Sequence, residues 1–122
     1  MSDRPTFEHR GRPVRAAGVL LWTRHDGHVH RLFRKVNGKF EDIGGKTDPA
    51  DTSAVATAVR ETVEETGGKL FSEFHTRERC GEILHRLLEQ TTTVEYNQRS
   101  KYLLFKLKVE PSILEVSMKR FG

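Results

Sequence analysis

Three glutamates stand close together near the end of one short segment. Glu61, Glu64 and Glu65 fall three and four positions apart within 52–66, a range that contains no Gly or Pro. On a helix such residues are neighbours, and their like charges repel. Hard cations such as Mg²⁺ and Mn²⁺ take carboxylate oxygens as ligands and would reverse the sign of that interaction. The spacing therefore predicts a metal site on Glu61, Glu64 and Glu65, with an ordinary solvated acidic face as the alternative.

Local signals define the helix that must carry these carboxylates. Thr52 or Ser53 is a suitable N-cap, and the glycine pair 67–68 is a strong stop signal. At about 100° per residue, the side predicted to face the core comprises Val55, Val59, Thr62 and Val63. Arg60 lies on the other side, one turn before Glu64, where it can anchor a carboxylate through charge-assisted hydrogen bonds.

Two glycines precede this helix. Gly44 and Gly45 lack side chains, so their backbone can approach a ligand closely, and a tight turn after them would place that backbone beside the helix. A plain turn is the alternative. Nearby, Lys46, Lys35 and Phe40 could contact phosphates or a base, although a solvated lysine and a buried aromatic ring are the ordinary interpretations.

Taken together, residues 44–68 resemble the Nudix box, the signature of the Nudix hydrolase superfamily. The positions that match are Gly45, Arg60, Glu61, Glu64, Glu65 and Gly67. The stretch departs from the box at Asp51, which stands where the family has glutamate and is separated from Arg60 by one extra residue. Thr62 and Gly68 replace apolar residues, and Leu70 is a candidate for the missing apolar contact.

The resemblance implies both a fold and a reaction. The fold class is α+β, an α/β/α sandwich around a mixed β-sheet. The reaction is metal-dependent hydrolysis of a diphosphate linkage in a nucleoside diphosphate derivative, by attack of water on phosphorus, with Mg²⁺ or Mn²⁺ as cofactor. Glu61, Glu64 and Arg60 are the implied catalytic residues. The implied metal ligands are the Gly44 carbonyl with Glu61, Glu64 and Glu65, and the implied substrate contacts are Gly45, Lys46, Lys35 and Phe40.

The rest of the chain predicts the scaffold. We expect one domain over 1–122, with an irregular arm over 1–13, strands over 14–23 and 28–36, and a strand or transitional segment over 69–74. A helix over 76–90 would be an insertion that shapes the substrate pocket or a homodimer contact. Two antiparallel strands should follow it, over 91–96 and 101–109. No closing element is evident around 117–122, so a C-terminal element is expected to be missing. Glu110, Glu115 or a residue beyond Gly122 is the expected general base.

Composition indicates the kind of protein and the compartment in which it works. The 122 residues are 35% hydrophobic and 31% charged with a net charge of +4, which suits a folded protein that favours anionic ligands. No apolar run of about 18 residues occurs, so a membrane span is not expected. Cys80 is the single cysteine, which excludes an internal disulfide and indicates a reducing, intracellular, cytoplasmic setting.

Two alternatives to nucleotide hydrolysis remain at this point. One is a binding module that recognises a nucleotide or an RNA end without hydrolysing it. The other is hydrolysis of capped RNA, with a basic arm that follows the RNA backbone. The arm's cations are Arg4, Arg10, Arg12 and Arg15.

Overall fold

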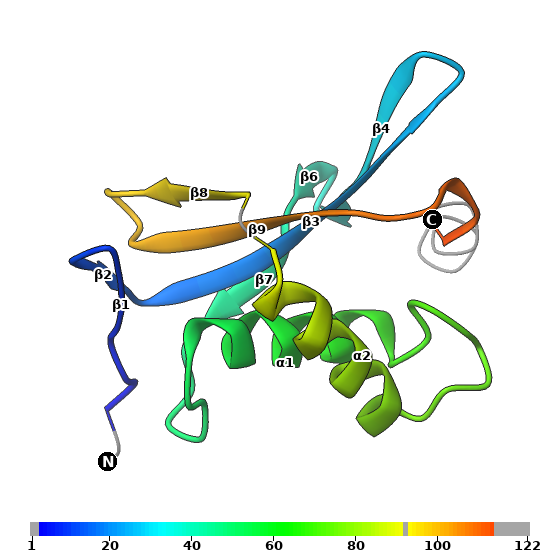
Figure 1. Ribbon diagram of the computed structural model, residues 1–122. Coiled ribbons are helices and arrows are strands. Elements are labelled where there is room, and N and C mark those ends of the chain that lie inside the picture. The colour runs from blue at the N-terminus through cyan, green and yellow to red at the C-terminus, as the bar shows by residue number, and fades with distance from the viewer. Residues whose placement is uncertain (1–2, 92, 114–122) are drawn as a thin grey trace.

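One long strand organises the sheet (Figure 1). The computed structural model describes residues 3–91 and 93–113, with only the backbone for 34–36. Strand β3 (Ala16–His25) pairs in parallel with β9 (Tyr102–Lys108) along one edge. Along its other edge it pairs antiparallel with β7 (Ile43–Lys46) in its first half and β4 (His28–Leu32) in its second half. Strand β8 (Val94–Asn97) pairs antiparallel with β9 and completes a five-stranded mixed sheet.

Two short hairpins lie outside this sheet. They are formed by β1 (Phe7–His9) with β2 (Arg12–Val14), and by β5 (Arg34–Val36) with β6 (Lys39–Glu41). In the second, Asn37 and Gly38 both have positive φ, at 50° and 80°, which is the geometry that Asn-Gly hairpin turns adopt. The first corrects the irregular arm predicted over 1–13 from Phe7 onward, whereas 3–6 form no regular element. Arg10 and Gly11 make a turn of the same kind, and Pro13 is tolerated because its strand belongs to a two-stranded ribbon.

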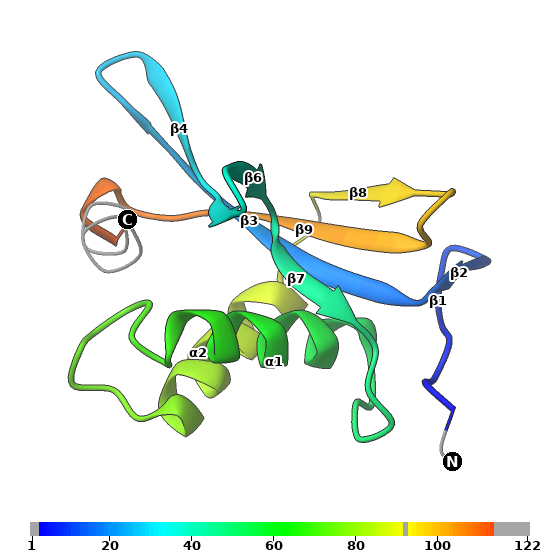
Figure 2. The ribbon, with the colours of Figure 1, turned by 180° about the vertical axis from the view of Figure 1, so that it is seen from behind.

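Two helices cover one face of the sheet. Helix α1 (Ala54–Thr66) begins after Ser53, whose side chain accepts a hydrogen bond from the Ala56 amide at 3.0 Å. It ends at Gly67, which has a φ of 63°. Helix α2 (Arg77–Glu89) packs on α1, and both lie on the same side of β3 and β9 in Figures 1 and 2. These positions confirm the helices predicted over 52–66 and 76–90. No strand forms over 69–74, where the chain bends and turns instead.

Alternate residues of the central strands build the core against these helices. The residues buried there include Val19, Leu21, Leu103, Phe105, Leu107, Ala58, Leu84 and Leu88. Leu70 also lies in this cluster, only 1% exposed, as expected of the residue that supplies an apolar contact after the glycine pair. Cys80 is buried with it, and burial raises the pKa of its thiol. Among the described residues, neither helix is long and apolar enough to cross a bilayer.

The arrangement confirms an α+β fold with helices packed against a mixed sheet, and it is consistent with an α/β/α sandwich. Tyr102, Leu104, Lys106 and Lys108 alternate with the core residues of β9, so they belong to the opposite face, which we call the open face. A short helical segment begins at 111–113. The predictions about a missing C-terminal element and about Glu115 lie outside the described residues.

Candidate functional site

Arg60 is the centre of the interactions between the loop and the helix. Its Nε and Nη2 donate to the two carboxylate oxygens of Asp51 at 3.0 and 3.1 Å. Nη2 also donates to the Lys46 carbonyl oxygen at 2.9 Å, at the end of β7. The guanidinium therefore joins strand, loop and helix. These bonds raise the pKa of Arg60, chiefly through the bonds to Asp51, so the group stays charged.

Asp51 is held from three directions. Its carboxylate accepts from the Asp48 amide at 2.9 Å and from the Thr57 hydroxyl at 2.8 Å, in addition to Arg60. Its side chain is 5% exposed. Burial by itself would raise the pKa of Asp51, but the hydrogen bonds from Arg60, Asp48 and Thr57 outweigh burial, and the pKa lies below its ordinary value. Asp51 thus fixes the loop to the helix and is not exposed to a ligand.

Glu61 lies against the backbone of β7. A Cβ atom added at Gly45 would be 2.5 Å from the Glu61 carboxyl carbon, so any other residue there would displace that carboxylate from its present position. The Glu61 side chain is 18% exposed, and its Oε1 accepts from Arg60 Nη1 at 3.1 Å. The sequence predicted that the backbone of the two glycines would lie beside the helix, and the structure brings Gly45 into direct contact with Glu61.

The other two glutamates differ in environment. Glu64 is 52% exposed on its side chain and reaches the same Arg60 Nη1 at 3.5 Å, a long ion pair. Glu65 is partly buried, and its Oε2 is shielded from solvent. Across the described ranges, no group of three or more His, Cys, Asp or Glu side chains is arranged to hold a metal ion. Arg60 offsets the repulsion between Glu61 and Glu64 here, and the predicted metal site stays a prediction.

Thr62 shows how a polar residue fills an apolar position of the box. It is fully buried, and its hydroxyl donates to the Ala58 carbonyl oxygen at 2.7 Å, one turn earlier. Thr66 repeats the arrangement toward the Thr62 carbonyl at 2.8 Å. Each buried hydroxyl therefore has a partner within the helix. Thr62 confirms the predicted core-facing side of α1, although this side also buries Thr57, Ala58 and Thr66.

A cleft of about 560 Å³ opens on the open face beside Gly44. Its lining includes Asp42, Gly44, Glu95, Asn97, Ser100 and Tyr102. Burial raises the pKa of Asp42, the nearby Glu95 raises it further, and Lys106 opposes these effects in part. With Glu41, the cleft therefore holds three carboxylates and several neutral hydrogen-bonding groups. Its lining is more polar than that of most small-molecule sites, so it suits a polar ligand.

Tyr102 lies over the backbone where β7 meets β3. A Cβ atom added at Gly18 or at Gly44 would be 1.9 or 2.0 Å from the Tyr102 hydroxyl oxygen. These two glycines face each other across the β3–β7 pair, and together they make room for the tyrosine. Sequence reasoning missed Tyr102 because the contact depends on the parallel register of β9, between segments distant in sequence. Of the residues that line the cleft, Gly44 was predicted as a site residue from the sequence, and Asp42, two residues before it, was not.

The remaining predicted contacts lie on the β5–β6 hairpin or near it. Lys35 and Phe40 are directly opposite each other in that hairpin. Phe40 is 71% exposed, and its ring is 6.5 Å from the ring of Phe33. Lys46 is exposed at the end of β7. Glu110 is exposed and lines a different cleft, with Arg24 and Phe71. Of the predicted site residues, Gly45 and Arg60 therefore contact the glutamates of α1, whereas Glu110 lies on another surface.

Comparisons with known proteins do not assign this chain to a family. No family model matches the chain. A search of curated proteins finds Endonuclease MutS2 of Clostridium perfringens (strain 13 / Type A), 25% identical over 95 residues. The match covers 75% of this chain and 12% of that protein, so the chain spans about an eighth of its relative's length. At this identity the similarity does not establish a family.

Proposed function

We propose that the protein is a metal-dependent nucleotide pyrophosphohydrolase, which hydrolyses a diphosphate linkage in a nucleoside diphosphate derivative. The single observation that carries the proposal is the contact of Glu61 with Gly45, which holds a carboxylate of the acidic helix against the glycine strand. The R-E-x-x-E-E string alone is compatible with a solvated surface. A glycine whose Cβ would collide with the carboxylate is better explained by a requirement to position that carboxylate.

The donor set fits a hard cation in its chemistry. Glu61, Glu64 and Glu65 would hold Mg²⁺ or Mn²⁺ together with the Gly44 carbonyl, because all four groups offer oxygen. When bound, such a cation neutralises phosphate charge and lowers the pKa of a water ligand. Glu64 is more than half exposed and Arg60 reaches it only at 3.5 Å, so its carboxylate can turn toward Glu61 at small cost.

The chain's own residues would perform the positioning. Arg60, fixed by Asp51 and the Lys46 carbonyl, orients the carboxylate of Glu61. Gly45 keeps the strand close to that carboxylate, and its neighbour Gly44 lines the cleft on the other face of the sheet. The cleft, where Asn97, Ser100 and Tyr102 offer hydrogen bonds, would take the nucleoside part of a substrate that passes the edge of β7. Lys46, at the exposed end of β7, is the proposed phosphate contact.

A substrate screen tests the proposal. The purified chain is incubated with nucleoside triphosphates, ADP-ribose, dinucleoside polyphosphates, nucleotide sugars, coenzyme A and capped RNA, with Mg²⁺, with Mn²⁺ and with a chelator. Because the curated relative is an endonuclease, single- and double-stranded DNA are included. We expect metal-dependent release of a nucleoside monophosphate from at least one substrate, and its loss in Glu61→Gln but not in Glu82→Gln on α2. Cleavage of DNA alone, or no turnover at all, would contradict the proposal.

One observation favours a second function, a nucleotide- or RNA-binding module without hydrolysis. Arg60 already contacts Oε1 of both Glu61 and Glu64, so part of the acidic charge is offset within the protein. Tight binding of a nucleotide in the presence of a chelator, with no product, would support this alternative.

The cytoplasmic setting and a homodimer through α2 are further proposals. The first rests on the lone Cys80, and the second on the predicted role of the 76–90 helix.

A further inference from the structure

Three cations lie together on the open face, at the end of the sheet away from the cleft. Trp22 of β3 has Lys108 of β9 beside it on one side and Arg31 of β4 opposite it on the other. Arg24 follows Trp22 by two residues, so it belongs to the same face. We call Arg24, Arg31 and Lys108, with Trp22 among them, the basic stripe.

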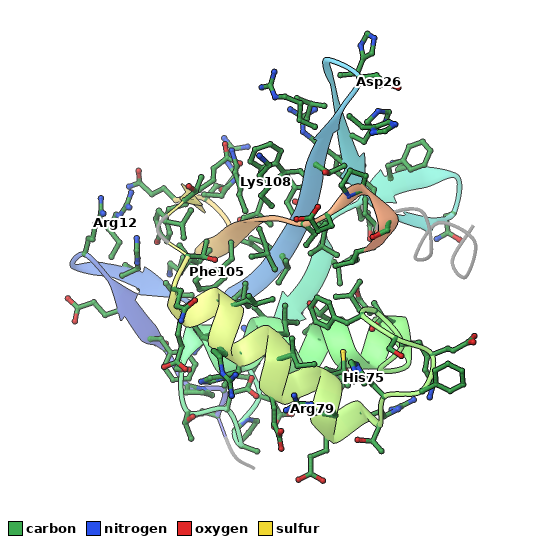
Figure 3. All side chains as sticks on the ribbon, turned by 45° about the vertical axis from the view of Figure 1, so that its right-hand side comes forward. Arg12, Asp26, His75, Arg79, Phe105 and Lys108 are labelled. Carbon is green, nitrogen blue, oxygen red and sulfur yellow. The ribbon has the colours of Figure 1, made fainter. Side chains whose placement is uncertain are left out.

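Lys108 confirms the side of the sheet to which the stripe belongs. Its ammonium is 5.5 Å from the centre of the Trp22 ring, within the range of a cation–π interaction. Figure 3 shows Lys108 on the side of the sheet away from α2, whereas Phe105 of the same strand lies on the helix side. The stripe continues onto the β3–β4 hairpin, which projects beyond the other strands with Asp26 at its tip.

The stripe is accessible and carries net positive charge. Arg24, Arg31 and Lys108 are all exposed. Within the described ranges, none of the three forms an ion pair with a carboxylate. Lys106, by contrast, has Glu95 at 3.9 Å and marks the boundary toward the acidic cleft. Glu110 lines one cleft together with Arg24 and Lys108, but the three cations outnumber this carboxylate, and a surface with net positive charge favours an anionic partner.

The N-terminal arm, which the sequence made the candidate for such a partner, is engaged elsewhere. Arg4 and Arg15 donate to each other's backbone carbonyl oxygens, at 3.4 and 2.8 Å. Arg12 stacks on the ring of Tyr96, 4.3 Å from its centre. These guanidinium groups hold the arm to the domain. The basic stripe therefore replaces the arm as the cationic surface of this protein.

We propose that the basic stripe binds the phosphodiester backbone of a single-stranded nucleic acid. Such a strand presents regularly spaced negative charges, and a row of Lys and Arg with an aromatic ring is the usual complement to it. The stripe crosses three adjacent strands, β9, β3 and β4, so a flexible single strand can follow it over about 10 Å. This binding goes beyond the proposed hydrolysis and does not depend on it, because none of the stripe residues belongs to the box.

Fluorescence anisotropy with a labelled oligouridylate about 12 nucleotides long tests this inference. Binding is measured in chelator, at several salt concentrations, for the parent chain and two triple variants. The stripe variant is Arg24→Gln, Arg31→Gln and Lys108→Gln. The control is Arg77→Gln, Arg79→Gln and Arg86→Gln on α2, which removes the same charge from another surface.

We expect the stripe variant to lose on the order of tenfold or more in affinity at low salt, with the salt dependence of log K reduced by about 2, or about 0.7 for each cation. The control should change little. Equal losses in both variants, or no loss in the stripe variant, would overturn the proposal. A variant with Arg24→Lys, Arg31→Lys and Lys108→Arg keeps the charges and should retain binding, and a thermal melt of the Gln variant that matches the parent shows that its loss of binding is not misfolding.

Two further ligands separate the nucleic acid from other anions. A duplex of the same length should bind more weakly than the single strand, and vesicles that contain phosphatidylserine should not depend on the stripe. If the vesicles alone show stripe-dependent binding, the surface is a membrane contact and the proposal is wrong. If the parent chain binds the oligouridylate through the stripe but hydrolyses none of the nucleotide substrates, the result counts against the proposed function and not against this inference.

Discussion

Arg60 and Asp51 form a two-point contact, Nε to Oδ1 at 3.0 Å and Nη2 to Oδ2 at 3.1 Å. Where the resembled motif has glutamate, this chain has the shorter aspartate and one more residue before the arginine. The planar guanidinium meets the Asp51 carboxylate through two hydrogen bonds, a geometry that adds both strength and orientation to the pair.

Asp51→Ala should therefore destabilise the fold. The change leaves Arg60 without its main partner and the Thr57 hydroxyl without its acceptor, which should cost about 2–3 kcal/mol. Urea unfolding of the parent and variant measures the difference. Glu82→Ala is the control, because the Arg79–Glu82 pair is exposed and its loss should cost less than about 0.5 kcal/mol. Similar losses in both variants would mean that Asp51 contributes no more than a surface ion pair.

The lowered pKa of Asp51 predicts an acid-sensitive fold. A carboxyl group whose pKa is lower in the folded chain adds stability above its unfolded pKa, near 3.8, and loses it as the pH falls through the folded value. The free energy of unfolding should thus fall on the acid side of about pH 4. Asp51→Asn should be less stable at neutral pH and should show a smaller fall. A parallel acid dependence in parent and variant would contradict this assignment.

Gly45→Ala tests the carboxylate contact directly. The new methyl group would lie 2.5 Å from the Glu61 carboxyl carbon, so Glu61 must move away from β7. We expect most of the hydrolytic activity to be lost while the chain still folds. Gly81→Ala on α2 is the matched control, because its Cβ would meet Val59 and Val63 at 3.6 and 3.7 Å, ordinary contact distances. That variant should keep its activity and gain about 0.5–1 kcal/mol in stability, since alanine favours a helix interior. An active Gly45→Ala protein would show that the position of Glu61 is not important.

Local patterns predicted the elements that carry the box. The stop at 67–68, the N-cap at Ser53 and the uninterrupted segment between them define α1, and the structure has the same helix. The β1–β2 hairpin was missed because Pro13 and Gly11 suggest irregular chain unless the pairing of Phe7 with Val14 is known. That pairing depends on burial of Val14, which a local pattern does not reveal.

The cleft could not be predicted for a related reason. Tyr102 reaches Gly18 and Gly44 only because β9 lies parallel to β3, with Gly18 next to Leu104. A parallel pairing joins segments that are distant in the sequence, and one residue of slippage would move Tyr102 to the other face. The sequence correctly predicted that Arg60 anchors carboxylates. Its main partner, however, is Asp51 and not Glu64.

Glu64→Gln separates a metal site from a solvated acidic face. Its ion pair with Arg60 is long and exposed, so without metal the variant should melt within a degree or two of the parent, a change of a few tenths of a kcal/mol. If Glu64 holds a catalytic cation, Mg²⁺ or Mn²⁺ should raise the melting temperature of the parent and should raise that of the variant much less. The variant should also lose most of its turnover. Thermal melts over a metal titration and one activity assay measure both effects.

Glu78→Gln, on the exposed first turn of α2, controls for the lost charge and should keep both the metal response and the activity. A divalent cation that stabilises all three proteins equally would be binding elsewhere or acting as general screening. An active Glu64→Gln protein with unaltered metal dependence would remove Glu64 from the site, and Arg60 alone would then account for the closeness of the glutamates. We expect instead a folded variant that is nearly inactive and does not respond to metal, because the long contact with Arg60 leaves the Glu64 carboxylate able to turn toward a cation beside Glu61.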